Sequence, residues 1–205
     1  KKFEIINYEN LFDFKKIRKL TIGFDPALFT KKQIKKIFPR KNTKLIEKNL
    51  VDEIVSFENI ETNKFYALDK KITGQSHSIK IRNIANYLKK EKIDYIFVSA
   101  PENVAWILNI RGKDSPTSPI PNSHLIISHK KKKFMIAPKK KLKDLNKLNI
   151  IKPEESIDPK KTEILIKKLK GRTILIDTQS CSLKFEKIFS KKFKIKKKNR
   201  SNLLT

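Results

Sequence analysis

The residues best placed to do chemistry lie in one short stretch, W-I-L-N-I-R-G-K-D-S-P, from Trp106 to Pro116. Arg111 and Asp114 are charged, and prolines at 116, 119 and 121 hold the surrounding backbone out of regular structure. Charged side chains on a rigid loop are a common way to bind a substrate or a partner. Arg111 and Asp114 are therefore functional candidates, against the alternative that they form a local ion pair that only pins the loop.

Three residues at the borders of this loop are further candidates. Trp106 belongs to the apolar run A-W-I-L, where we favour a core position over a ligand-stacking one. Asn122 and Ser123 end the loop just before the strand-like run S-H-L-I-I-S. These three residues complete the candidate set, for contacts with a substrate or a partner subunit.

No metal or nucleophile site is indicated elsewhere. His124 and His129 are five residues apart on a predicted strand, so they fall on opposite faces, and we interpret the histidines as surface residues. The single cysteine, Cys181, has no recognisable base beside it and is interpreted as a small, partly buried helical residue. Asp177 ends a strand, where catalytic groups are often found, but D-T-Q-S also fits a helix cap, which we favour. The scattered acidic residues argue against a two-metal nuclease.

The elements that must position these residues alternate between strands and helices from residue 65 onward. Alternation of this kind predicts an α/β sheet with helices against its faces. Gly171 is expected to close the helix that precedes the fourth strand. The predicted strands are 94–99, 125–128, 134–137, 173–177 and an edge strand around 193–195. The predicted helices are one that Ser76 or Ser78 caps and that runs through residue 90, followed by 101–109, 139–148, 159–169 and 180–189.

The first 64 residues predict only pieces of an α/β unit. A strand over 19–24 is followed by an Asp25-Pro26 turn and by a short helix that Thr30 caps and a proline at 39 ends. A short strand at 44–46 and a helical turn over 49–57 follow. These elements are too few to close a core of their own.

The composition bears on the cellular compartment and on binding to nucleic acid or other polyanions. The formal charge is +28 and the isoelectric point about 10.1, but lysine far outnumbers arginine and is spread along the whole chain. Lys, Ile and Asn have AT-rich codons, so a genome-wide bias explains this charge at least as well as nucleic-acid recognition; non-specific polyanion binding at low salt is still expected. The sequence has no membrane-spanning run and no signal peptide, and one cysteine fits a reducing cytoplasm.

Four sequence segments resemble one known family. The run A-W-I-L-N-I-R-G-K-D-S-P-x-x-P-I-P-N-S resembles the second N-terminal domain of the Xaa-Pro aminopeptidases, in the creatinase/prolidase ("pita-bread") peptidase group. Residues 22–30 resemble its G-[YF]-D-P-x-L-x-T segment, residues 49–54 its N-L-V-D-x-I-W segment, and residues 66–82 the start of its second domain, with matches that include Gly74 and Lys80. Phe29 and Val55 depart from the histidine and tryptophan common in the family.

The resemblance implies a mixed β-sheet flanked by helices, creatinase N-terminal-like and ribonuclease-H-like, preceded by the end of a similar domain. It divides the chain into the end of a first domain with a linker (1–64), a second domain (65–200) and a junction (201–205). The family's catalytic domain binds two divalent metals, usually manganese, through two aspartates, a histidine and two glutamates. None of those ligand motifs occurs here, and the chain begins with lysine rather than methionine, so we expect an N-terminal fragment that is inactive alone.

The function implied is that of a non-catalytic portion of a cytoplasmic, metal-dependent Xaa-Pro aminopeptidase, which removes the N-terminal residue preceding proline. In such an enzyme this portion would shape access for short proline-containing peptides and would contact its own C-terminal catalytic domain and a second subunit of a homodimer. Arg111, Asp114, Asn122, Ser123 and Trp106 are the residues expected at the substrate entrance or the interface. The alternative is a stand-alone lysine-rich domain that binds nucleic acid or another polyanion.

Overall fold

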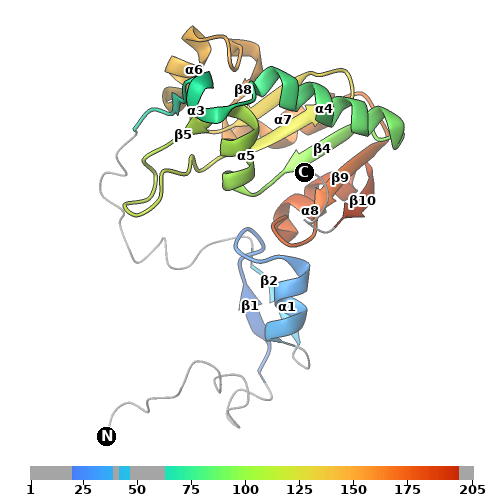
Figure 1. Cartoon of the computed structure of the whole chain (residues 1–205). Coiled ribbons are helices and arrows are strands. Elements are labelled where there is room, and N and C mark those ends of the chain that lie inside the picture. Colours follow the sequence, from blue (N-terminus) through green and yellow to red (C-terminus); the bar gives the residue numbers. More distant parts are fainter. Residues whose placement is uncertain (1–19, 39–41, 47–62, 199–205) are drawn as a thin grey trace, which may run out of the picture. The chain divides into compact units, whose positions relative to one another are not determined.

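The computed structural model describes residues 20–38, 42–46 and 63–198, which belong to two compact units (Figure 1). The first unit comprises residues 1–57 with 182–184, and the second comprises residues 58–181 with 185–205. The predicted proline stop at 39 and the predicted helical turn over 49–57 lie outside the described residues.

The first unit contains two short parallel strands and one helix. Strand β1 (Ile22–Phe24) pairs with β2 (Thr43–Leu45), and α1 (Lys31–Ile37) lies between them in sequence. Thr30 and Gln33 exchange hydrogen bonds in a capping box that fixes the start of α1. The Asp25 side chain accepts from the Ala27 amide at 2.7 Å, which closes the expected turn. The predicted strands, turn and helix start are confirmed.

A six-stranded mixed sheet forms the centre of the second unit, in the order β10-β9-β4-β6-β7-β8. Strands β10, β9 and β4 are parallel, β4, β6 and β7 are successively antiparallel, and β8 is parallel to β7. This topology confirms the predicted α/β class and the β6–β7 hairpin. The strands are β4 (Tyr95–Val98), β6 (His124–Ser128), β7 (Lys133–Ile136), β8 (Ser156–Ile157), β9 (Thr173–Asp177) and β10 (Lys194–Lys198), and a separate pair consists of β3 (Tyr66–Ala67) and β5 (Ile110–Arg111).

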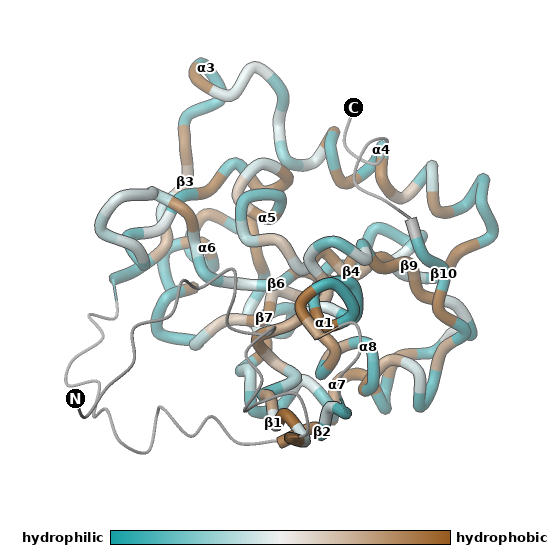
Figure 2. The backbone as a smooth tube through the Cα atoms, turned by 90° about the horizontal axis from the view of Figure 1, so that it is seen from below, coloured by the Kyte–Doolittle hydropathy of each residue, from teal (hydrophilic) through white to brown (hydrophobic). Residues whose placement is uncertain are grey.

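Helices cover both faces of this sheet. Apolar residues of α4 (His77–Lys90), α5 (Pro101–Leu108) and α6 (Lys143–Lys147) pack on one face, and those of α7 (Thr162–Lys168) and α8 (Leu183–Ser190) pack on the other. In Figure 2, α4 alternates between brown and teal along its length, as expected of a helix with one apolar face. The remaining helical segments are the short α3 (Lys70–Thr73) and 3₁₀ turns at 139–142, 153–155 and 159–161. No helix in the described ranges is long and apolar enough to cross a membrane.

The two faces of β4 supply two separate hydrophobic clusters. Ile96 and Val98 belong to the cluster under α4 and α5, and Tyr95 and Phe97 belong to the cluster under α7 and α8. All four residues are buried, as expected of a central strand covered on both sides. The alternation along β4 therefore divides the core between the two helical layers.

Two predicted boundaries differ from the structure. α8 begins at Leu183 rather than at residue 180, and Asp177 does not cap it: its carboxylate accepts from the Gln179 amide at 2.9 Å and the Ser180 hydroxyl at 2.8 Å, and so closes a turn. α7 is capped at Leu169, so Gly171 is not the cap. Gly171 has φ of +145°, and an added Cβ would lie 2.9 Å from the Tyr95 ring, so a close approach to β4 requires glycine here.

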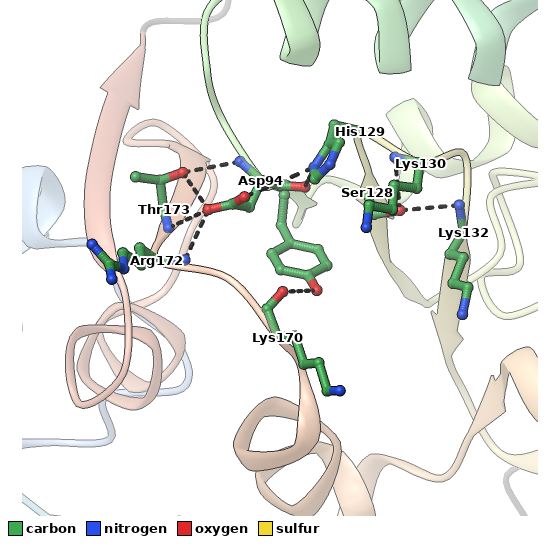
Figure 3. A network of polar contacts seen from close by, with 9 residues as sticks. Asp94, Ser128, His129, Lys130, Lys132, Lys170, Arg172 and Thr173 are labelled. Carbon is green, nitrogen blue, oxygen red and sulfur yellow. Dashed lines mark hydrogen bonds and ion pairs between the residues drawn. The ribbon is translucent and has the colours of Figure 1, made fainter.

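One carboxylate joins the start of β4 to the start of β9 (Figure 3). Asp94 Oδ2 accepts from the Arg172 amide at 2.8 Å, the Thr173 amide at 2.9 Å and the Thr173 hydroxyl at 2.9 Å. The Asp94 amide in turn donates to Thr173 Oγ1 at 2.9 Å, and the Asp94 carbonyl accepts from the His129 amide at 3.0 Å. Asp94 therefore fixes the register of β4 against β9 and holds the β6–β7 turn.

These hydrogen bonds also set the ionisation of Asp94. Burial alone would raise the pKa of this carboxyl, but the donors from Arg172 and Thr173, with His129 nearby, hold its pKa below the usual value. A carboxyl with a lowered folded-state pKa stabilises the fold above its unfolded pKa, and this contribution is lost as the pH falls through the folded pKa.

We expect Asp94→Asn to lower the free energy of unfolding by about 1–2 kcal/mol at pH 7, because a neutral amide accepts these hydrogen bonds more weakly. The difference from wild type should shrink as the pH falls below the ordinary carboxyl pKa and through the lowered folded-state pKa of Asp94. Urea denaturation at several pH values measures both effects. The exposed Glu91→Gln is the matched control, and an Asp94→Asn loss that is equal at pH 7 and pH 3 would contradict the assignment.

Candidate functional site

The candidate loop begins where α5 ends. Asn109 caps α5 in the left-handed conformation (φ 54°, ψ 44°) and turns the chain into β5. There Arg111 pairs with Tyr66 of β3 in an antiparallel register. The loop then runs to His124, the first residue of β6. It is therefore anchored at both ends in regular structure.

A buried lysine holds the start of the loop. The Lys80 side chain comes from α4, and the residue is 4% exposed. Its Nζ donates to the Trp106 carbonyl and to Asn109 Oδ1, both at 2.7 Å. Asn109 Nδ2 donates onward to Thr73 Oγ1 at 3.1 Å and to the Gln75 carbonyl at 2.7 Å. One amide side chain thus links α3, α4 and α5.

Trp106 lies on the outside of α5, so its predicted core position is wrong. The side chain is 42% exposed, while its helical neighbours Ala105 and Ile107 are buried. Only one side of a helix faces the core, so an unbroken apolar run cannot be buried completely. Trp106 lies on the side that faces away from the core. Lys80 Nζ lies 4.0 Å from the centre of the indole ring, a cation–π contact at the surface.

Asp114 forms an ion pair, but not with Arg111. Its Oδ1 contacts Lys141 Nζ, and both side chains are 8% exposed. Its Oδ2 accepts from the Asn122 amide at 2.7 Å. Arg111 instead donates from Nη1 to the Ile110 carbonyl at 2.9 Å. The expected local Arg111–Asp114 pair is therefore wrong, and the loop is pinned by a lysine 27 residues further along the chain.

Close packing fixes the middle of the loop. A Cβ on Gly112 would lie 2.8 Å from Pro121 Cα and 3.1 Å from the Phe65 ring, so only glycine fits without a shift. The Gly112 amide donates to the Pro119 carbonyl at 3.0 Å. Ser123 is 2% exposed, and its hydroxyl donates to the Pro121 carbonyl at 3.1 Å. Ser123 is thus held inside the fold, whereas the Asn122 residue is exposed.

We call four accessible side chains near the start of this loop the loop face. Trp106 and Tyr66 are 42% and 41% exposed, Ile72 is 74% exposed, and Arg111 is half-buried. Tyr66 and Ile72 were not predicted as site residues. The sequence could have identified Lys80 as a buried residue of α4. It lies four residues before Ile84 and eight before Leu88, which places it on the apolar face of that helix.

The other candidate chemistries gain no support from the geometry. Burial raises the pKa of the Cys181 thiol to about 12, with Glu186 and Asp177 adding to the effect, and the residue lies in a turn rather than on a helix. His124 packs between Phe97 and Phe185, and burial lowers its pKa, so the surface interpretation is wrong for it. Within residues 20–38, 42–46 and 63–198, no three His, Cys, Asp or Glu side chains are grouped so that they could hold a metal ion.

Comparison with known proteins identifies related sequences and a related fold. The family model described as the Creatinase/Prolidase N-terminal domain matches residues 58–204. Xaa-Pro aminopeptidase 1 of Dictyostelium discoideum is 33% identical over 90 residues, which are 40% of this chain and 14% of that protein. A Caenorhabditis elegans Xaa-Pro aminopeptidase is 31% identical over 144 residues, which are 67% of this chain and 23% of that protein.

A solved structure shares the fold. The X-prolyl aminopeptidase from Caenorhabditis elegans, described as a cytosolic enzyme with a di-nuclear active site, superposes with a TM-score of 0.72 at 22% identity. The match covers 91% of this chain and 33% of that chain. The chain therefore corresponds to only a part of the proteins that it resembles.

We expect Asp114→Ala to lower the free energy of unfolding by about 3–5 kcal/mol, because it leaves Lys141 buried without its carboxylate. Replacing both partners, Asp114→Leu with Lys141→Met, should recover most of that loss, since no unpaired charge remains. Urea denaturation measures the change. Lys113→Ala is the control in the same loop, and a double variant no more stable than Asp114→Ala would refute the pairing.

The single tryptophan allows Lys80 to be followed directly. Burial, and secondarily the charge of Arg111, lower the pKa of Lys80 below the ordinary 10.5. The indole emission should therefore change as the ammonium beside it loses its proton, with a midpoint below 10.5. Because the folded-state pKa is lowered, the contribution of Lys80 to stability should rise with pH between that pKa and 10.5.

Lys80→Met should remove this emission change, whereas Lys89→Met, on an exposed position of the same helix, should keep it. A pH titration of tryptophan fluorescence on the three proteins provides the measurement. An identical titration in Lys80→Met would assign the change to tyrosine ionisation and would disprove the Lys80 interpretation.

Proposed function

Because this chain belongs to the creatinase/prolidase N-terminal domain family, we propose that it is the non-catalytic N-terminal portion of a metal-dependent Xaa-Pro aminopeptidase. Such an enzyme removes the N-terminal residue of a peptide that has proline in second position. The matched relatives carry that name, and the chain spans 14% and 23% of their lengths. A stand-alone lysine-rich binding domain is not favoured, because the family match covers most of the chain.

The proposed domain organisation follows from the same match. Residues 65–200 are taken as the second creatinase-type domain, residues 1–64 as the end of a first domain with its linker, and residues 201–205 as a junction to a catalytic domain. A cytoplasmic location and a homodimer are part of this proposal. The description of the C. elegans structure as a cytosolic enzyme supports the location.

The two metal ions of such an enzyme are assigned to the catalytic domain. The described part of this chain has no group of side chains that could hold a metal ion, so its residues do not fit that role. Under this proposal, the described part of this chain therefore has no role in the catalytic step. Its contribution is to bind and orient the peptide or to limit which peptides enter.

The loop face is the surface proposed to do so, and one observation carries the proposal. The loop is held rigid by the buried Asp114–Lys141 pair and the packing of Gly112, yet Trp106 and Tyr66 remain exposed. Rigidly placed aromatic rings suit the apolar ring of proline, and the Arg111 guanidinium can donate to peptide carbonyls or to the carboxylate of a short peptide. A fixed face of this kind can line an entrance at little entropic cost.

In the full-length enzyme encoded by the reading frame, we expect Arg111→Ala to raise KM for X-Pro-Pro tripeptides about fivefold or more with little change in kcat, because it removes uniform substrate binding. Steady-state kinetics with Mn²⁺ give both constants. The chain of 205 residues, assayed alone with Mn²⁺, should release no amino acid.

Lys113→Ala is the matched control, because Lys113 is an exposed cation two residues away on the same loop. Equal effects of the two substitutions would show that Arg111 acts only through general charge. Mn²⁺-dependent cleavage by the 205-residue chain alone would overturn the assignment of a non-catalytic role.

A further inference from the structure

Four groups of exposed cations lie at one end of the central sheet of the second unit. The segment K-K-E-K at residues 89–92 spans the end of α4, and the β6–β7 turn carries K-K-K at residues 130–132. α7 leads into K-K-L-K-G-R at residues 167–172, and β10 starts within K-K-F-K at residues 191–194. Every lysine and arginine in these segments is exposed, and Glu91 is the one acidic residue among them. We call these four segments the basic end.

The topology of the sheet brings these segments together. β4, β9 and β10 are parallel and start at this end, and β6, antiparallel to β4, finishes there. The His129 amide donates to the Asp94 carbonyl at 3.0 Å, and the Tyr95 hydroxyl donates to the Lys170 carbonyl at 2.5 Å (Figure 3). The Lys194 amide donates to the Arg172 carbonyl at 2.7 Å. The four groups are therefore neighbours, although the first and the last are separated by almost half of the sequence.

The opposite ends of β4 and β9 lack lysine and arginine. Residues 99–103 follow β4, and residues 177–181 begin at the last residue of β9. These two segments contain Glu102 and Asp177 and no lysine or arginine. The edge strand β10 ends in K-K-K at residues 196–198, beside the end of β9, so only β4 and β9 have their cations confined to the starting end.

The charge of the basic end is not neutralised within the described residues. The lysines that form ion pairs in the described residues are Lys64, Lys133, Lys141, Lys147 and Lys197, and none of these belongs to the basic end. The nearby carboxylate of Asp94 accepts from main-chain amides and the Thr173 hydroxyl. Lys192 Nζ donates to the Lys167 carbonyl, and the other exposed ammonium groups of the basic end have no carboxylate partner among the described residues.

We propose that the basic end binds the phosphate backbone of duplex nucleic acid without sequence preference, an activity separate from the aminopeptidase role. Lysine contacts phosphates as a point charge, and the single arginine offers little of the forked geometry that reads base edges. The one aromatic residue in the four segments, Phe193, is 4% exposed, so no ring is free to stack on unpaired bases.

A membrane surface fits these observations less well. None of the large hydrophobic side chains that are exposed in the described structure lies in the four segments. Stable attachment to a bilayer needs a second, apolar element in addition to a basic patch. Phosphate contacts on a duplex need only the distributed cations that are present.

The test compares the full chain with a variant of the basic end, Lys130→Gln, Lys132→Gln, Lys170→Gln and Lys191→Gln. Binding of a short fluorescent DNA duplex is followed by polarisation between about 50 and 200 mM salt. Each phosphate contact removed should reduce the slope of log K against log salt by about 0.9, and affinity at physiological salt should fall about tenfold or more. All four residues are exposed, and circular dichroism checks that the fold is kept.

The control carries the same loss of charge elsewhere on the second unit, Lys70→Gln, Lys113→Gln, Lys139→Gln and Lys143→Gln, again at exposed positions. It should keep the wild-type salt slope to within about one unit. Equal losses in the two variants would attribute binding to diffuse charge and overturn the proposal. Binding of the wild type to phosphatidylserine vesicles but not to the duplex would also overturn it, in favour of a membrane surface.

Discussion

The burial of β4 on both faces is the constraint on which the second unit depends. Successive residues of this strand pack against opposite layers of helices. A slip of one residue would therefore exchange Ile96 and Phe97 between the two clusters. The Asp94 carboxylate prevents such a slip, because it fixes the start of β4 against Arg172 and Thr173 of the neighbouring strand. Both the loop after α5 and the lysine-rich end of the sheet are positioned by elements that pack on this strand.

The elements of regular structure were largely predictable from the sequence, because their determinants are local. Ser76, one of the two expected caps, caps α4, Pro101 starts α5, and the apolar runs give β4 and β9 nearly residue for residue. The errors arose where a local pattern had two explanations. Asp177 fits both a helix cap and a turn, and the choice of the turn depends on Ser180 and the packing of the following residues.

The site was predictable only in part. The loop and its charged residues stand out in the sequence, but the partner of Asp114 is Lys141, and no local pattern links residues 27 positions apart. The exposure of Trp106 depends on which side of α5 faces the core, and the uniformly apolar run around it leaves that side undefined. Pairings at long sequence separation are set by the tertiary fold, and the composition of the chain carries no information about them.

The environment of Cys181 has a practical consequence for studies in solution. The chain has one cysteine, it is 1% exposed, and its thiol has a pKa of about 12, so almost no thiolate exists at neutral pH. Maleimide and iodoacetamide reagents need an accessible thiolate, and this residue offers neither accessibility nor charge. A cysteine introduced on the surface would therefore take a fluorophore or spin label selectively, with the native residue left in place as part of the core.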